Sequence, residues 1–145
     1  MIDFLSLYSG AVNPALVKIG KPAINPLIME LKSASTDSGV KANAAWVLGE
    51  LKAEESTEPL IALLGDEATI VRSYSAQALT KMGKTAVQPL IDSLNSDNWL
   101  IRVNAAVVLG AIGDREAIGP LTKLLEDKDW VVRETAAEVL EKINA

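Results

Sequence analysis

The chain has 145 residues, and 49% of them are hydrophobic, so it can form one soluble domain with a buried core. It contains no cysteine and no histidine, which excludes disulfide bonds, thiolate metal sites, a cysteine nucleophile and the commonest general base. The formal net charge of -5 disfavours nucleic acid as a partner, because binding to a phosphate backbone depends on lysine and arginine.

The sequence carries no sign of export or membrane insertion. Residues 1–10 include Asp3 and no basic residue, unlike a secretory signal peptide. The longest nearly apolar run, residues 105–113, is too short to cross a bilayer. Together with the lack of cysteine, these features lead us to expect a cytoplasmic protein without membrane contacts.

A proline-leucine pair recurs along the chain at a nearly constant interval. The four prolines are 33, 30 and 31 residues apart, and each is followed by an aliphatic-basic pair with spacings of 31, 30 and 31. Such a period indicates a stack of repeated supersecondary units. The first pairs are Pro26-Leu27, Pro59-Leu60, Pro89-Leu90 and Pro120-Leu121, and the second are Val40-Lys41, Val71-Arg72, Ile101-Arg102 and Val132-Arg133.

Residues 1–21 are expected to form half a repeat that caps the N-terminal end of the array. Residues 15–21 align with residues 78–84, at the boundary between two later repeats. The preceding residues have apolar side chains at the spacing of one helix face. These apolar residues are Ile2, Leu5 and Tyr8, and Asn13-Pro14 would begin the following helix.

Four full repeats follow, at residues 22–53, 54–83, 84–113 and 114–145. In each repeat a first helix that holds the proline-leucine pair is expected to lead through a turn to a second helix. Asp37, Asn98 and Asp129 are suited to cap second helices, because their side-chain oxygens can accept hydrogen bonds from first-turn amides. We predict an all-α fold, an α-solenoid or superhelix of about four and a half helix pairs, in a single domain spanning 1–145.

Each second helix has an apolar stripe at helical spacing, which we expect to face the interior. The stripes are Val40, Ala44, Val47, Leu48 and Leu51; Val71, Ser75, Ala78, Leu79 and Met82; Ile101, Ala105, Val108, Leu109 and Ile112; and Val132, Ala136, Val139, Leu140 and Ile143. Gly49, Thr80 and Gly110 share one position, where a small side chain would let the next repeat pack closely. The fourth repeat has Glu141 there, as expected of a repeat that ends the array.

The second helices share a Val-Arg-x-x-Ala-Ala-x-x-Leu-Gly pattern, seen for example in Ile101-Arg102 and the segment Ala105 to Gly110. This pattern resembles the HEAT-like repeats named after the phycobilisome lyases, over roughly residues 22–144. The resemblance implies the solenoid fold. It says little about function, because binding proteins and enzymes share this repeat.

The resemblance also implies a binding surface, because the second helices line the concave face of HEAT-like stacks. All three tryptophans fall on this face, opposite the apolar stripes, and tryptophan and tyrosine are typical interface anchors. Packing within or between repeats is the alternative role for the tryptophans and for Tyr74. We predict a partner-binding site formed by Asn43, Trp46, Tyr74, Gln77, Trp99, Val103, Asn104, Val107 and Trp130.

The function expected from these features is that of a protein-protein interaction scaffold and not of an enzyme, with another protein as partner. We expect no catalytic residue, metal or cofactor. A homo-oligomer is not predicted, although the apolar row Trp99, Val103, Val107 and Ala111 leaves it as an alternative. Arg72, Arg102 and Arg133 recur near Asp66, Asp97 and Asp127, and we expect them to bridge neighbouring repeats and not to bind an anion.

Two other function classes are alternatives to the scaffold. A bilin-lyase-type subunit is the first alternative, although bilin lyases are longer, usually paired proteins and this sequence marks no bilin site. A nucleic-acid binder similar to the HEAT-like alkylpurine DNA glycosylases is opposed by the acidic charge. The iron-binding His-Glu pairs of HEAT-like deoxyhypusine hydroxylases have no counterpart here, because the chain has no histidine.

Overall fold

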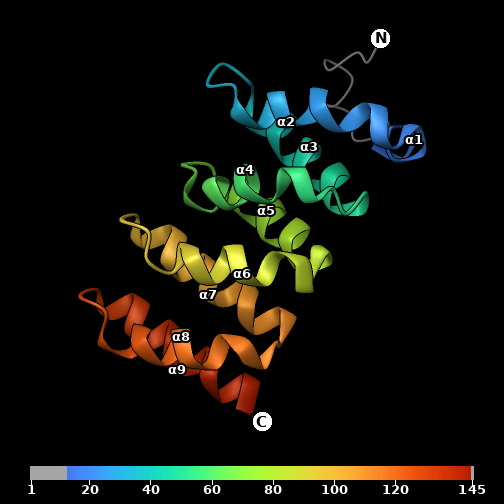
Figure 1. The fold of residues 1–145 in the computed structure, drawn as a ribbon. Coiled ribbons are helices and arrows are strands. Elements are labelled where there is room, and N and C mark those ends of the chain that lie inside the picture. The colour runs from blue at the N-terminus through green and yellow to red at the C-terminus, as the bar shows by residue number, and fades with distance from the viewer. Residues whose placement is uncertain (1–12, 145) are drawn as a thin grey trace.

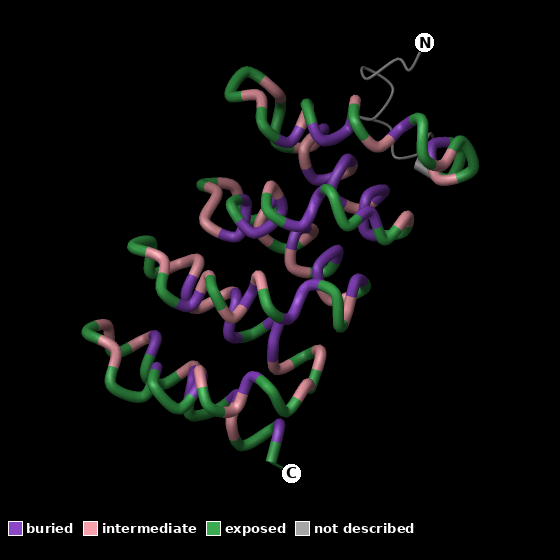
Figure 2. The backbone as a smooth tube through the Cα atoms, viewed as in Figure 1, coloured by how far each residue is buried: buried purple, intermediate pink, exposed green. Residues whose placement is uncertain are grey.

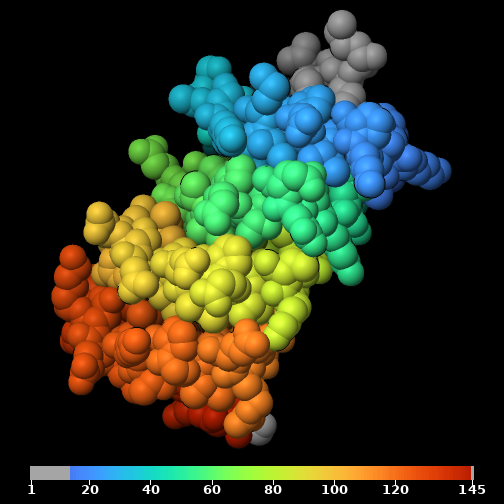
Figure 3. Space-filling view, in the orientation of Figure 1, coloured from blue at the N-terminus to red at the C-terminus, as the bar shows by residue number. Residues whose placement is uncertain are grey.

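The computed structural model describes residues 13–144, which form nine α-helices stacked into a solenoid (Figure 1). Successive helix pairs follow one another along the stack, so each repeat contacts its neighbours in sequence (Figure 3). The predicted all-α solenoid is therefore confirmed. The helices are α1 (Asn13–Ile19), α2 (Ile24–Lys32), α3 (Ser38–Glu50), α4 (Thr57–Ala62), α5 (Thr69–Met82), α6 (Lys84–Ser93), α7 (Trp99–Ile112), α8 (Ile118–Lys123) and α9 (Trp130–Asn144).

The helix pairs are α2 with α3, α4 with α5, α6 with α7 and α8 with α9, and we number them repeats 1 to 4. The second helices contact one another in the order α3, α5, α7, α9, and the first helices α2, α4 and α6 also contact in sequence. The repeats are thus built as two helical layers. Helix α1 is described from Asn13, the first described residue, so the predicted helix start at Asn13-Pro14 stays a prediction. The predicted capping residues Ile2, Leu5 and Tyr8 lie outside the described residues.

The prolines help to determine where the first helices begin. Pro26, Pro59 and Pro120 each occupy the third position of their helix, where the missing N–H costs no intrahelical hydrogen bond. A 3₁₀ turn precedes each of these helices. Pro89 lies further inside α6, which begins at Lys84.

The core is formed by residues of both layers. Figure 2 shows buried residues, in purple, on the helices along the whole stack. Most of the predicted stripe residues are buried, and Leu48, Leu79 and Leu109 are each 0% exposed. The exceptions, Leu51, Ile101, Ile112 and Leu140, are half-buried and pack against the core. Leu27, Leu60, Leu90 and Leu121 of the proline-leucine pairs are also fully buried. The repeated leucines of the two layers therefore belong to one continuous core.

Two glycines allow second helices to approach closely. A Cβ on Gly49 would lie 2.7 Å from the Cα of Ala78, and one on Gly110 would lie 2.8 Å from Cγ1 of Val139. Both distances are shorter than real Cβ contacts, so the prediction that this position needs a small residue is confirmed for these two repeats. Thr80 takes the position in repeat 2 and donates its hydroxyl hydrogen bond to the carbonyl of Ala76 in its own helix.

The turns before the second helices are held by side-chain caps. Asp37, Asn98 and Asp129 accept hydrogen bonds from the N–H groups of Gly39, Leu100 and Val131 at 2.8, 2.9 and 2.9 Å. Their predicted capping roles are confirmed. Helix α5 follows Ala68, which has no capping side chain, and here the Ala68 N–H donates to Asp66 Oδ2 at 2.9 Å.

The repeated arginines behave less uniformly than the sequence predicts. Arg102 bridges repeats 3 and 4 through the carboxylate of Asp127. Arg72 instead donates to the carbonyls of Asp66 and Glu67 at 2.6 and 3.0 Å, and Arg133 to the carbonyl of Asp127 at 2.7 Å. These two arginines hold their own turns, because backbone carbonyls of the turn lie within reach of the guanidinium.

No helix among residues 13–144 is long and apolar enough to span a membrane.

Candidate functional site

The candidate site is the side of α3, α5, α7 and α9 that faces away from the buried stripes, which we call the second-helix face. Exposed residues recur on it at helical spacing in α5, α7 and α9, where buried residues occupy the opposite side. In α3 even Ala42, on the predicted face, is buried, and only Ser38 and Glu50 are exposed. Trp99, Val107 and Trp130 are 45%, 48% and 65% exposed. These apolar side chains belong to neighbouring repeats, so the solenoid brings them to one surface.

Trp46 lies on this face in α3, but it is half-buried and packs against the core. The Nζ of Lys81 in α5 lies 5.3 Å from the centroid of the indole ring, a cation–π geometry. Lys81 also forms an ion pair with Glu50 of α3. The Trp46 ring is therefore held between core contacts and a lysine that joins repeats 1 and 2.

Four other predicted site residues, Asn104, Tyr74, Asn43 and Gln77, differ in their burial and in their hydrogen bonds. Asn104 donates from Nδ2 to the carbonyl of Leu64 at 2.7 Å and thus links repeats 2 and 3. Tyr74 is half-buried and packs against the core, and Asn43 is half-buried. Gln77 is exposed, with its Nε2 3.4 Å from the hydroxyl of Ser73. Asn104 and Tyr74 are therefore fixed by contacts with other repeats or with the core, whereas Gln77 is open to solvent.

The part of the face formed by α7 and α9 combines an apolar row with carboxylates. Val103 is half-buried in α7 and packs against the core, while Trp99 and Val107 are exposed in the same row. Glu134 and Glu138 are exposed on the neighbouring helix α9. The face therefore offers aromatic and aliphatic contacts beside negative charge.

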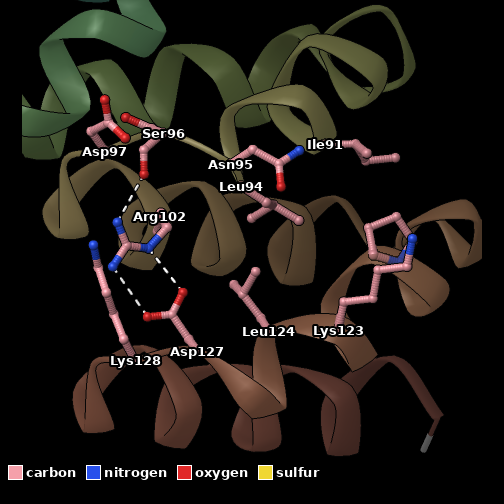
Figure 4. Close-up of a pocket in the computed structure, with 11 residues that line it drawn as sticks. Ile91, Leu94, Asn95, Ser96, Asp97, Arg102, Lys123, Leu124, Asp127 and Lys128 are labelled. Atoms are coloured by element: carbon pink, nitrogen blue, oxygen red, sulfur yellow. Dashed lines mark hydrogen bonds and ion pairs between the residues drawn. The ribbon is translucent and has the colours of Figure 1, made fainter.

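A cleft of about 450 Å³ lies between repeats 3 and 4, away from the predicted site residues (Figure 4). Leu94 and Leu124 line its apolar side, and Arg102 and Asp127 form an ion pair at one end. Burial alone would raise the pKa of Asp127, but hydrogen bonds from the Asp129 N–H and the Arg102 guanidinium hold that pKa below its usual value. The sequence does not predict this cleft, because the cleft depends on how repeats 3 and 4 pack and the periodicity does not specify that packing.

The two ion-paired side chains of this cleft, Arg102 and Asp127, are held by other groups of the chain itself. Arg102 is 5% exposed and also donates from Nη1 to the carbonyl of Ser96 at 2.8 Å. Its guanidinium thus serves to join two repeats. Within residues 13–144, no group of three or more Asp or Glu side chains is placed to hold a metal ion. The second-helix face is therefore the stronger candidate for function.

Comparisons with known proteins identify the repeat and two curated relatives. HEAT repeats are matched by residues 24–102 and 87–145. A phycocyanobilin lyase subunit alpha of Picosynechococcus is 39% identical over 92 residues, covering 57% of this chain and 34% of that protein. A protein of the same name from Nostoc is 33% identical over 104 residues, covering 65% of this chain and 38% of that protein. The chain spans about a third of the length of these relatives.

A solved structure supports the same fold. It is the complex of CpcE and CpcF of phycocyanin lyase from Nostoc, and one chain of it matches with a TM-score of 0.60 and 19% identity. The match covers 94% of this chain and 96% of that chain. At this level of identity the likeness shows the shared solenoid fold alone.

These relatives overturn one expectation from the sequence. The prediction that the chain is not an enzyme is wrong, because both curated relatives are named as lyase subunits and point to a lyase subunit. The prediction relied on the missing histidine and cysteine. Missing residue types exclude particular catalytic side chains, but they do not exclude a place in an enzyme made of several subunits.

Proposed function

This chain belongs to the HEAT-repeat family, and we propose that it acts as a bilin-lyase-type subunit whose second-helix face binds another protein of the lyase assembly. The observation that carries this proposal is the 39% identity to a phycocyanobilin lyase subunit alpha. The matching chain of the two-protein lyase complex shares the solenoid fold that this proposal assumes. We propose that the activity belongs to the assembly and not to this chain alone.

The partner surface that we propose consists of the nine residues predicted from the sequence. The exposure of Trp99, Val107 and Trp130 supports this assignment, because large exposed apolar side chains that gather on one surface are typical of interaction sites. The proposed substrate of the assembly is an open-chain tetrapyrrole of the phycocyanobilin type. A cytoplasmic location, expected from the lack of cysteine, also stays a prediction.

The substrate is tested by titrating phycocyanobilin into the pure chain, into Nostoc CpcF and into a mixture of the two. We expect an absorbance change in the mixture that exceeds the sum of the changes in the two separate titrations. An identical spectrum with and without the chain in every titration would contradict the lyase-type proposal. Tryptophan emission followed in the same titration reports whether the pigment comes close to the chain.

The partner surface is tested by sedimentation of the chain with CpcF. The double variant Trp99→Ala and Trp130→Ala should weaken the complex by roughly 2 kcal/mol or more, about a thirtyfold loss of affinity. Met29→Ala is the matched control, because Met29 is an apolar side chain of α2 that is 71% exposed and lies in the other layer. Equal affinity of the double variant and the control would show that the face is assigned wrongly.

A further inference from the structure

The exposed row of α7 on the second-helix face is apolar along its whole length. Trp99, Val103, Val107 and Ala111 follow one another at intervals of four residues, so they share one side of the helix. Three of them are exposed, and Val103 is half-buried. Helix α7 has 14 residues, which corresponds to a length of roughly 21 Å. An apolar strip of this shape fits an elongated partner segment.

The helix on one side of this row is acidic. Glu134 and Glu138 are exposed on α9, which packs against α7, and neither carboxylate forms an ion pair with another residue in the range 13–144. Lys142, one turn beyond Glu138, is the only basic residue in this row of α9. The carboxylates therefore present negative charge that the described part of the chain leaves unneutralised.

The helix on the other side of the row is close to neutral on this face. Ser73 and Gln77 of α5 are uncharged, and Lys81 is already paired with Glu50. The charge around the apolar row is thus one-sided, with negative charge on the α9 side. A partner that matches it needs apolar groups in the middle and positive charge on one flank.

We infer that this strip receives an amphipathic helix of the partner protein, with apolar residues toward α7 and lysine or arginine on the flank beside Glu134 and Glu138. A helix presents side chains at the same 3.6-residue period as α7, so its apolar ridge can pack along the row. A second copy of the chain fits less well, because it would bring its own acidic α9 to the contact. This inference rests on the proposed function of the second-helix face as a partner site.

The inference is tested with three synthetic helical peptides, each as long as α7 and with the same leucine-alanine stripe. Their flanks carry lysine, glutamine or glutamate, and binding of each labelled peptide to the full chain is followed by fluorescence anisotropy. The lysine peptide should bind at least about tenfold more tightly than the glutamate peptide, and rising salt should reduce this preference. Equal binding of the three peptides, or no binding by any, would overturn the inference.

Charge-reversal variants locate the contact. The double variant Glu134→Lys and Glu138→Lys should reverse the preference between the lysine and glutamate peptides. The double variant Glu55→Lys and Glu58→Lys changes the net charge equally, and these exposed residues lie in and just before α4, in the other layer. It should retain the lysine preference. If both double variants lose it equally, the preference reflects net charge alone and the assignment to α9 is wrong.

Two further measurements separate this inference from its alternatives. Sedimentation of the chain alone checks for a second copy on the strip, and a dimer that Val107→Asp dissociates would replace the partner helix as the occupant. The phycocyanobilin titration and the CpcF affinity do not depend on the peptide flanks. A failed peptide preference with a positive CpcF result would therefore reject the helix chemistry and leave the proposed function standing.

Discussion

Arg102 and Asp127 join repeats 3 and 4 through two parallel hydrogen bonds. Nε of Arg102 lies 2.9 Å from Oδ2 of Asp127, and Nη2 lies 3.1 Å from Oδ1 (Figure 4). Their side chains are 5% and 12% exposed. Two-point contacts of this kind fix the relative orientation of the two groups, so the pair constrains the rotation of one repeat against the next.

Asp127→Asn should lower the free energy of unfolding at pH 7 by about 2 to 3 kcal/mol, because it leaves the charge of Arg102 buried without its counter-ion. Urea unfolding of both proteins measures this difference. Asp97→Asn is the control, because Asp97 is exposed in the same cleft and should change stability by less than about 0.5 kcal/mol. Similar losses in the two variants would show that the ion pair adds little.

The same pair predicts a pH dependence. The pKa of Asp127 is lower in the folded protein than its ordinary value, so the folded state favours the ionised carboxylate. Its contribution is fully present above the unfolded-state pKa, about 3.9, and is lost as the pH falls through the lower folded-state pKa. The stability difference between wild type and Asp127→Asn should therefore be constant from pH 7 to 5 and shrink below about pH 4. A difference that grows on acidification would contradict this assignment.

The close contact at Gly49 predicts opposite effects for two glycine substitutions. Gly49→Ala should destabilise the protein by about 1 to 3 kcal/mol, because the new Cβ would meet the backbone of Ala78 and force α3 and α5 apart. Gly119→Ala, within helix α8, meets no atom within 4 Å and should stabilise it by about 0.4 to 1 kcal/mol. Thermal and urea unfolding measure both. If both substitutions changed the stability in the same direction, the contact between α3 and α5 would not explain the effect of Gly49→Ala.

Most of the fold could be predicted because the same sequence pattern occurs in four repeats, so each feature of the pattern is seen several times. The period placed the helix pairs, and the apolar spacing identified buried residues such as Leu48, Leu79 and Leu109 correctly. The arginines were predicted less well. Arg72 and Arg102 occupy one repeat position, yet the side chain of one bonds to turn carbonyls and the other to Asp127. Rotamers and the exact turn geometry decide such contacts, and periodicity carries no information on either.

The candidate site could be predicted only as a helix side. Helical phase correctly placed Trp99, Val107 and Trp130 opposite the stripes. It did not reveal that Trp46 is half-buried, because this depends on the contact between repeats 1 and 2 and on Lys81. The lyase relationship could not be read from residue chemistry either, since the resemblance is carried by repeats that support many functions.

Ser75 provides a test of the buried stripe itself. It is 0% exposed at a position where repeats 1, 3 and 4 have alanine, and its Oγ has no hydrogen-bond partner among the described residues. Ser75→Ala should raise the free energy of unfolding by about 1 kcal/mol, because it removes an unsatisfied buried polar group. Denaturant unfolding measures the change. A loss of similar size would indicate that the hydroxyl is satisfied in solution.

Truncation of Leu109 and of Trp46 distinguishes a core residue from a surface anchor. Leu109→Ala should cost about 2 to 5 kcal/mol of stability, because Leu109 is 0% exposed and its truncation leaves a cavity. Trp46→Ala should cost less, about 1 to 2 kcal/mol, because only part of the indole packs against the core. If Trp46 anchors the partner, its truncation should also weaken binding to CpcF by roughly 2 kcal/mol.

Fluorescence tests the position of Trp46 without any partner, in a background that carries Trp99→Phe and Trp130→Phe. Lys81→Ala should increase iodide quenching and move the emission toward that of a solvated indole, because the lysine lies 5.3 Å from the ring centroid and shields it. Lys84→Ala is the control, since Lys84 pairs with Asp114 and Glu116 at 2.8 and 3.2 Å and does not contact Trp46. An unquenchable Trp46 in the Lys81→Ala protein, with a stability loss on truncation equal to that of Leu109→Ala, would place Trp46 in the core and remove it from the proposed site.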